Sequence, residues 1–299
     1  MRPWRTRRIW KGGVDTLDSS ITPRQRILRT FLKNRTAVIG AVIAVCVAGV
    51  AIFSPLIAPY SPVRQNVRYR FQPPQGAHIF GTDFYGRDVF SRVIYGARIS
   101  LLVGTSSVLL GMVLGTAMGM VAAYRGGRLE TLIMRAVDVM MSFPDEVLGI
   151  MIMVALGSGL FNLILAIAIL MAPRFARLAY GPTLALRERD YVDAARAVGC
   201  GDIRVLFRHI LPNIFGEVLV MSTLWTATAI RLEANLSFLG LGVSPPTPTW
   251  GNMIRTGLDH LTDAWWVSVF PGAAILVTVL AFNMLGDGLR DIADPKLRT

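Results

Sequence analysis

Three carboxylates stand inside an otherwise apolar stretch, and their chemistry needs an explanation. Asp138, Asp145 and Glu146 fall within residues 132–156, which are mostly aliphatic. A charged side chain at the centre of a bilayer costs about 2.5–3.5 kcal/mol on insertion scales, so such residues are functional candidates. We expect these three carboxylates to line a path and to meet the amino group of a peptide or another cationic solute.

The spacing of these residues leaves a second interpretation open. Asp138 and Asp145 are seven residues apart and would share one face of a straight helix, although Pro144 could kink it. The alternative is a position closer to the membrane surface, or pairing with one of three arginines of the same chain: Arg135, Arg174 and Arg231.

A polar and basic segment, 180–213, carries a second pattern. Asp190 can cap a short helix, Asp193 adds negative charge to its first turn, and Gly199 suits a left-handed end. Small side chains leave this helix thin enough to enter a groove on another protein, and they are Ala194, Ala195 and Ala197.

A second short helix is expected to start at Asp202. Its apolar side would carry four residues: Ile203, Leu206, Phe207 and Ile210. Pro212 then redirects the chain into the next apolar segment.

The sequence lacks patterns for several other kinds of chemistry. It contains no G-x-x-x-x-G-K-[ST] phosphate loop, so a nucleotide would have to bind elsewhere. No nucleophile, base and orienting residue occur together. The histidines show no metal-ligand spacing, so we assign no metal site to His78, His209 or His260.

The elements that position these residues are membrane-spanning helices. Of the 299 residues, 53% are hydrophobic and 17% are charged, which is too apolar for one soluble core. A spanning helix needs roughly 20 mostly apolar residues. We therefore expect an all-α polytopic membrane protein with six transmembrane helices, at 36–57, 99–124, 132–156, 161–178, 214–230 and 267–285.

Two features shape individual spans. Gly111, Gly115 and Gly119 recur every four residues, which predicts a helix face where a neighbouring backbone approaches closely. The alternative is that glycine is simply frequent in membrane helices. Pro173 is expected to interrupt or kink the fourth span.

The distribution of basic residues predicts the orientation. The N-terminal tail 1–35, the turn 125–128, the segment 180–213 and the tail 290–299 are basic and fall on one side, which should be cytoplasmic. The net charge of +12 is thus assigned to orientation and not to nucleic acid. Three arginines of the external segment weaken this count without reversing it: Arg64, Arg68 and Arg70.

The expected organisation follows from these assignments. It comprises a cytoplasmic tail 1–35, a first transmembrane helix 36–58, an external segment 59–97, a core 98–289 and a cytoplasmic tail 290–299. The core contains the loop 180–213 and an external loop 233–264.

The polar segment resembles the EAA loop of ABC importer permeases, whose pattern is Glu-Ala-Ala, three residues, Gly, nine residues, then an apolar residue, any residue and Leu-Pro. Asp193 stands in place of the glutamate and His209 in place of the apolar residue. The matching residues are Ala194, Ala195, Gly199, Leu211 and Pro212. The ending His-Ile-Leu-Pro-Asn is typical of the dipeptide, oligopeptide and nickel subgroup. Segments 80–92, 236–252 and 270–295 resemble the shorter C-type permease of that subgroup.

This resemblance implies a type I ABC importer permease fold in a bacterial inner membrane, with both termini cytoplasmic. The implied partners are a second homologous permease, two ATP-binding subunits, an external solute-binding protein and the lipid bilayer, but no nucleic acid. ATP and Mg²⁺ would be bound by the partner subunits, and no cofactor by this chain. The resemblance assigns ATPase coupling to the matching loop residues, with Asp190 and Arg196 beside them.

Alternatives remain at two levels. The chain could be a self-sufficient secondary transporter or channel, whose coupling ions would bind at broken helices near the midplane. Within the family, the solute could be nickel or another small compound instead of a peptide.

Overall fold

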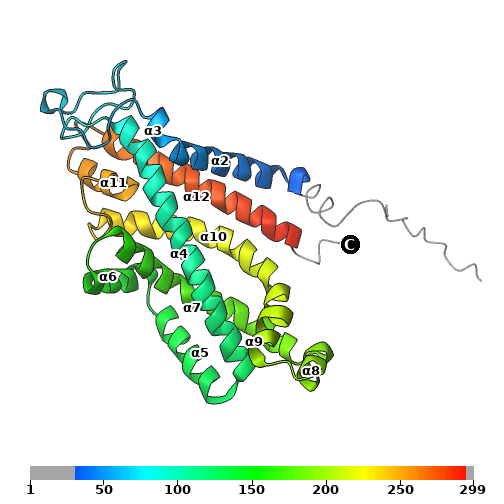
Figure 1. The fold of residues 1–299 in the computed structure, drawn as a ribbon. Helices are drawn as coiled ribbons and strands as arrows, with labels where there is room; N and C mark the ends of the chain where they lie inside the picture. Colours follow the sequence, from blue (N-terminus) through cyan, green and yellow to red (C-terminus); the bar gives the residue numbers. More distant parts are fainter. Residues whose placement is uncertain (1–30, 294–299) are drawn as a thin grey trace, which may run out of the picture.

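Helices make up most of the computed structural model, which describes residues 31–293 (Figure 1). No β-strand occurs within that range, apart from two isolated bridges. The expected tails, 1–35 and 290–299, lie largely outside the described residues.

Five helices are long and apolar enough to cross a membrane. They are α2 (Arg35–Ile52), α4 (Val89–Arg125), α7 (Leu160–Arg187), α10 (Leu211–Phe238) and α12 (Trp266–Ala293). A helix satisfies its own backbone hydrogen bonds, which makes it the form an apolar segment takes in lipid. The all-α polytopic fold is confirmed, and the sixth span is present only if a bent pair of helices is taken as one.

This bent pair consists of α5 (Gly127–Met141) and α6 (Asp145–Leu156), whose axes differ by 102°. The straight helix expected over 132–156 is therefore wrong. Pro144 disfavours a helical conformation at Phe143, so α5 ends before this pair and α6 starts after it. Asp138 and Asp145 consequently belong to different helices, and their seven-residue spacing places them on no common face.

The other spans also differ from the sequence expectation in their bounds. Helix α10 continues to Phe238 and α12 to Ala293, beyond the expected ends at 230 and 285, so the expected external loop 233–264 begins within α10. Helix α7 runs through Pro173 and Pro182 without interruption, because spanning helices tolerate the loss of single backbone bonds. Helix α4 begins at Val89 and has 37 residues, which corresponds to about 55 Å and exceeds the hydrocarbon thickness. The end of the expected external segment 59–97 is therefore helical.

Glycines line the contact between α4 and α7. A Cβ atom added to Gly115 would lie 2.1 Å from the carbonyl oxygen of Ala172, and one added to Gly119 would lie 2.1 Å from that of Ala176. A Cβ atom on Gly111 would lie 2.8 Å from the Cβ atom of Met171. All three glycines thus lie where the two backbones meet.

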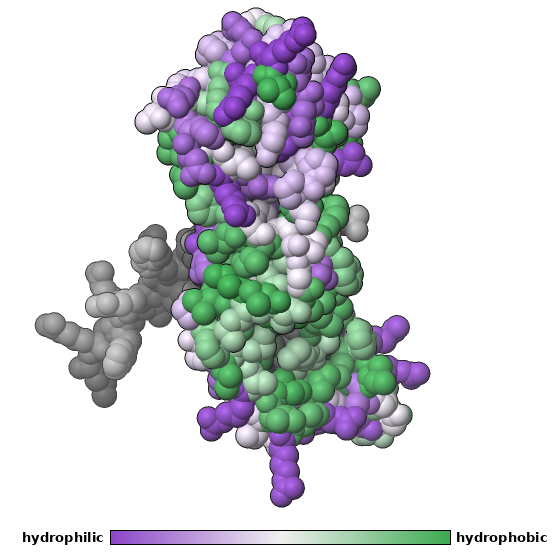
Figure 2. Space-filling model, turned by 90° about the vertical axis from the view of Figure 1, so that its left-hand side faces the viewer, coloured by the Kyte–Doolittle hydropathy of each residue, from purple (hydrophilic) through white to green (hydrophobic). Residues whose placement is uncertain are grey.

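The two ends of the helix bundle differ. Residues 58–88 and α11 (Trp250–Leu258) lie at one end, while α8 (Asp190–Ala197) and α9 (Asp202–Val205) lie at the other (Figure 1). On the face shown in Figure 2, hydrophobic residues gather over the middle and lower part and hydrophilic residues gather at the ends.

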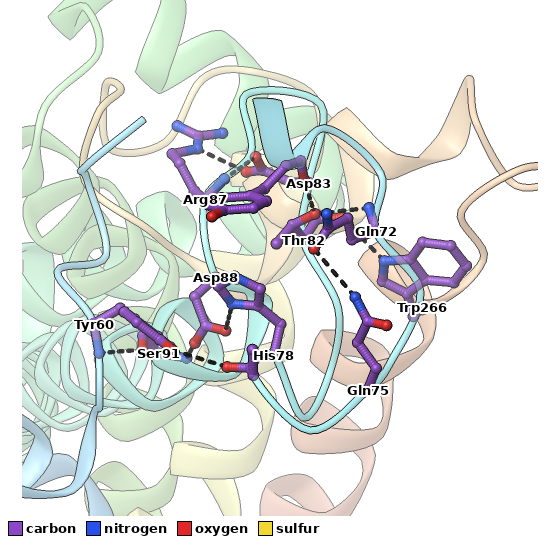
Figure 3. A network of polar contacts seen from close by, with 12 residues as sticks. Tyr60, Gln72, Gln75, His78, Thr82, Asp83, Arg87, Asp88, Ser91 and Trp266 are labelled. Carbon is purple, nitrogen blue, oxygen red and sulfur yellow. Dashed lines mark hydrogen bonds and ion pairs between the residues drawn. The ribbon is translucent and has the colours of Figure 1, made fainter. Parts of the chain in front are cut away.

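A polar network holds residues 58–88 onto the helices (Figure 3). Asp88 caps α4 by accepting a hydrogen bond from the Ser91 amide at 2.7 Å, and its other oxygen lies 2.9 Å from Nδ1 of His78. Nε1 of Trp266, the first residue of α12, donates to the Thr82 carbonyl oxygen at 3.0 Å. This segment therefore joins the starts of α4 and α12.

Candidate functional site

Helix α8 is the centre of the polar segment singled out by the sequence. Asp190 is its first residue and not its cap, because Arg189 takes the N-cap position without a side-chain hydrogen bond. The expectation for Asp190 as a cap was wrong. Asp190 and Asp193 still place negative charge in the first turn, where the helix dipole favours it.

The end of α8 has the conformation expected from Gly199. Its φ angle is +84°, and its amide donates to the Arg196 carbonyl oxygen at 2.9 Å. The Cys200 amide donates to the Ala195 carbonyl oxygen at 3.0 Å, so the two bonds form a Schellman motif. The left-handed helix end is confirmed.

The two faces of α8 have different surroundings. Val192 and Ala195 are buried in the main hydrophobic cluster. Tyr191, Ala194 and Val198 are exposed, and Val198 is 81% exposed. Only one alanine of the Ala194–Ala195 pair therefore faces outward, beside apolar neighbours.

The next helical turns repeat this division. Leu206 and Ile210 are buried, whereas Ile203 and Phe207 are 74% and 60% exposed. The single apolar side expected from these four residues was wrong, because the chain changes at Leu206 to a π-helical turn that alters the side-chain spacing. We refer to five exposed residues as the exposed loop face: Tyr191, Ala194, Val198, Ile203 and Phe207.

Polar contacts fasten this loop to the end of α4. Nε of Arg196 donates to the Tyr124 hydroxyl at 3.2 Å, and that hydroxyl lies 3.2 Å from Oδ1 of Asp202. Arg125 forms an ion pair with Asp202 at 3.0 Å. The hydrogen bond to Tyr124 raises the pKa of Arg196 above its ordinary value, so this side chain stays charged. Helices α8 and α9 thus share one anchor on α4.

A second connection runs along the chain itself. Helix α9, the π-helical turn 206–210 and α10 form one continuous helical segment, Asp202–Phe238. His209 lies in the π-helical turn, and its carbonyl oxygen accepts a hydrogen bond from Nδ2 of Asn213 at 2.6 Å. Leu211 and Pro212 begin α10, where proline needs no amide partner. The loop therefore continues without a break into a spanning helix.

The acidic candidates lie between α5, α6 and α7. Asp145 forms an ion pair with Arg174, so the pairing alternative holds for this residue. Asp138 pairs with Arg177, an arginine that sequence reasoning did not single out. Glu146 is partly buried and makes no ion pair within residues 31–293.

The Asp145–Arg174 pair lines a pocket of about 520 Å³. Trp225 of α10 forms part of its wall. The Trp225 and Phe175 rings pack edge-on, with their centroids 4.4 Å apart. Sequence reasoning missed Arg177 and Trp225. The signal for Arg177 was its three-residue spacing from Arg174, which places both arginines on neighbouring positions of one helix face.

Comparison with known proteins decides the family. Residues 111–299 match the family described as binding-protein-dependent transport system inner membrane component, and residues 22–74 match the N-terminal transmembrane domain of oligopeptide transport permease C. The chain belongs to this family of transport permeases.

Relatives of this permease are similar over nearly their whole length. A Brucella abortus protein named as a peptide transport system permease is 46% identical over 90% of this chain and 91% of its own. The dipeptide transport system permease protein DppC of Alkalihalophilus pseudofirmus is 41% identical over 94% of this chain and 92% of its own. The glutathione transport system permease protein GsiD of Pectobacterium atrosepticum is 40% identical over the full length of both chains.

A solved structure shares the fold. A chain of the inward-facing MetNI methionine ABC transporter aligns with a TM-score of 0.54 at 19% identity, over 68% of this permease and 97% of that chain. The type I ABC importer permease fold expected from the sequence is therefore confirmed. The permease is a multi-pass membrane subunit of an ABC importer, and its family works together with ATPase and permease subunits.

Proposed function

We propose that this permease forms half of a path for dipeptides or oligopeptides through the bacterial inner membrane. Coupling to an ATP-binding subunit is supported by the exposed loop face. This face is connected to α4 through the contact of Arg196 with Tyr124, and to α10 by a continuous helix. The names of relatives that are 40–46% identical support a peptide as the solute.

The proposed complex contains a second homologous permease, two ATP-binding subunits and an external solute-binding protein. ATP and Mg²⁺ bind to the ATP-binding subunits, which hydrolyse the nucleotide, and this permease holds neither. The exposed loop face docks on one of these subunits. ATP can shift the permease between its states only because it binds the two arrangements of the ATP-binding subunits with different affinity. The rearrangement of these subunits moves α8 and α9, which in turn move α4 and α10.

The orientation follows from charge. The segment 180–213 and both termini lie on the proposed cytoplasmic side. This segment carries five of the arginines that support the orientation: Arg187, Arg189, Arg196, Arg204 and Arg208. In the proposed orientation, the ATP-binding subunits dock on the α8 side and the binding protein docks against residues 58–88 and α11.

In this proposal Asp138, Asp145 and Glu146 lie along the solute path. Gly111, Gly115 and Gly119 hold α4 against α7, so that the force received at Tyr124 moves both helices together. The contrasting possibility is a secondary transporter that works alone.

Reconstitution separates the two possibilities. We expect ATP-dependent uptake of a labelled dipeptide into proteoliposomes that contain the permease pair and both ATP-binding subunits, with the binding protein outside. Liposomes with this permease alone should take up none. Uptake by the permease alone, driven by an ion gradient, would contradict the proposal.

A further inference from the structure

Two arginines of α7, one turn apart, each form an ion pair with an acidic residue of a neighbouring helix. Arg174 pairs with Asp145 at the start of α6, and one turn later Arg177 pairs with Asp138 of α5. Each contact joins one positive and one negative side chain. We refer to these four residues as the ion-pair ladder.

The ladder borders two neighbouring pockets. Asp145 and Arg174 line the pocket of about 520 Å³, and Asp138 lines a second pocket of about 430 Å³. Arg177 lines both. Beyond the ladder, the Tyr180 hydroxyl donates to Glu130, and both residues also line the second pocket. A polar route therefore follows α7 toward the end at which α8 begins.

Charge balance limits what can enter this route. An ion pair is net neutral, and removing or outcompeting one partner leaves the other charge without its counter-charge. This matters most at the Arg174–Asp145 pair, whose side chains are only 30% and 25% exposed. A solute with a single charge of either sign creates that imbalance. A solute that carries one ammonium and one carboxylate can insert between the partners and match both, so the site stays neutral.

The two partners also suit these groups individually. A guanidinium offers a planar pair of donors that fits a carboxylate, and a carboxylate accepts hydrogen bonds from an ammonium. The rest of the first pocket is apolar and includes Met140, Met141 and Trp225. Methionines adapt to different shapes, so this wall places few demands on a peptide side chain.

We propose that the ion-pair ladder recognises zwitterionic peptides by their two termini and passes them from the first pocket to the second. Arg174 and Arg177 receive the terminal carboxylate, while Asp145 and Asp138 receive the terminal ammonium. This inference rests on the proposed function and specifies its substrate class: short peptides with free termini and not metal cations. The side chains of the peptide contribute little to selection here.

The proposal is tested in the complete transporter by removing charges from the protein and from the peptide, singly and together, and measuring uptake. The peptides are a free dipeptide, its C-terminal amide and its N-acetyl form, each preloaded on the binding protein to a measured and equal level. In the wild type we expect either modification to lower uptake about tenfold, which is typical of one lost charged hydrogen bond. Arg174→Gln should lower uptake of the free dipeptide by a similar factor, and amidation should then cause a smaller further loss than in the wild type, because only Arg177 still receives the carboxylate. Asp145→Asn should behave in the same way toward acetylation.

Two comparisons exclude a purely structural role. Arg98→Gln changes an exposed arginine of α4 and should leave the preference for free termini intact. The double variant Asp145→Asn with Arg174→Gln restores neutrality at the first pocket and should discriminate less between free and modified peptides than the wild type, because only the Asp138–Arg177 pair remains. Equal uptake of all three peptides by the wild type would overturn the proposal, as would a loss in Arg174→Gln that is the same for each peptide. Failure of ATP-driven uptake altogether would instead contradict the proposed function.

Discussion

The Arg196 guanidinium of α8 lies 4.9 Å from the centre of the Tyr124 ring at the end of α4, and its Nε atom lies 3.2 Å from the Tyr124 hydroxyl. The same hydroxyl contacts Asp202, the first residue of α9. One aromatic side chain of a spanning helix therefore contacts both short helices of the loop that carries the exposed loop face.

This relationship predicts graded effects at Tyr124. Tyr124→Phe removes the hydroxyl contacts but keeps the ring under the guanidinium, whereas Tyr124→Ala removes both. An exposed cation–π contact contributes about 0.5–1 kcal/mol, so we expect uptake per ATP hydrolysed to fall further in the alanine variant, by about two- to fivefold relative to phenylalanine. The measurement is peptide uptake and phosphate release in the same proteoliposomes. Equal coupling ratios in the wild type and both variants would exclude Tyr124 from force transfer.

The contact between α4 and α7 predicts a stability effect at Gly115. Gly115→Ala places a methyl group 2.1 Å from the Ala172 carbonyl oxygen, and the helices must separate to admit it. Overpacking of this kind costs about 1–3 kcal/mol. The midpoint of thermal unfolding in detergent should therefore decrease.

Gly216 provides the matched control, because a Cβ atom there meets nothing within 4 Å and the residue is also helical. Gly216→Ala should leave the midpoint unchanged or raise it, since alanine favours helix by up to about 1 kcal/mol. Equal midpoints for the Gly115 and Gly216 variants would show that α4 and α7 do not meet at Gly115.

The left-handed end of α8 predicts that Gly199 resists substitution. At a φ angle of +84°, an L-residue costs about 1–2 kcal/mol, which would loosen the Schellman motif and the adjacent Val198. Gly199→Ala should reduce the amount of ATP-binding subunit that copurifies with the permease. Gly201→Ala is the neighbouring control, because Gly201 has a φ angle of −68° and open space around it. If both variants copurify the ATP-binding subunit as the wild type does, the shape of this helix end is unimportant for assembly.

Long stretches without charged residues were sufficient to locate the spanning helices, because an apolar segment in lipid has few alternatives to a helix. They could not reveal the 102° bend at Ser142–Pro144, since a proline is compatible with both a kink and a complete break. Pro173 illustrates the opposite outcome, as α7 continues through it. The bend direction depends on packing against α7 and α10, which one sequence does not specify.

Some local features of the loop could be predicted, whereas the contacts between helices could not. Gly199 has a local signature, because a left-handed helix end depends on the residue itself. The Asp138–Arg177 pair depends on how α5 packs against α7, so it has no local signature. The burial of Ala195 and the exposure of Ala194 likewise depend on how α8 sits against the core.

Site-directed crosslinking of α8 shows whether the exposed loop face docks on an ATP-binding subunit. In a variant with Cys46 and Cys200 replaced by serine, Ala194→Cys and Val198→Cys place thiols on the exposed loop face, and Ile79→Cys places one at the opposite end, where Ile79 is 58% exposed. In the assembled transporter we predict crosslinks from positions 194 and 198 to an ATP-binding subunit, weakened by Gly199→Ala, and none from position 79. Crosslinking of position 79 alone, or labelling of position 194 by an impermeant thiol reagent from outside the cell, would contradict the account.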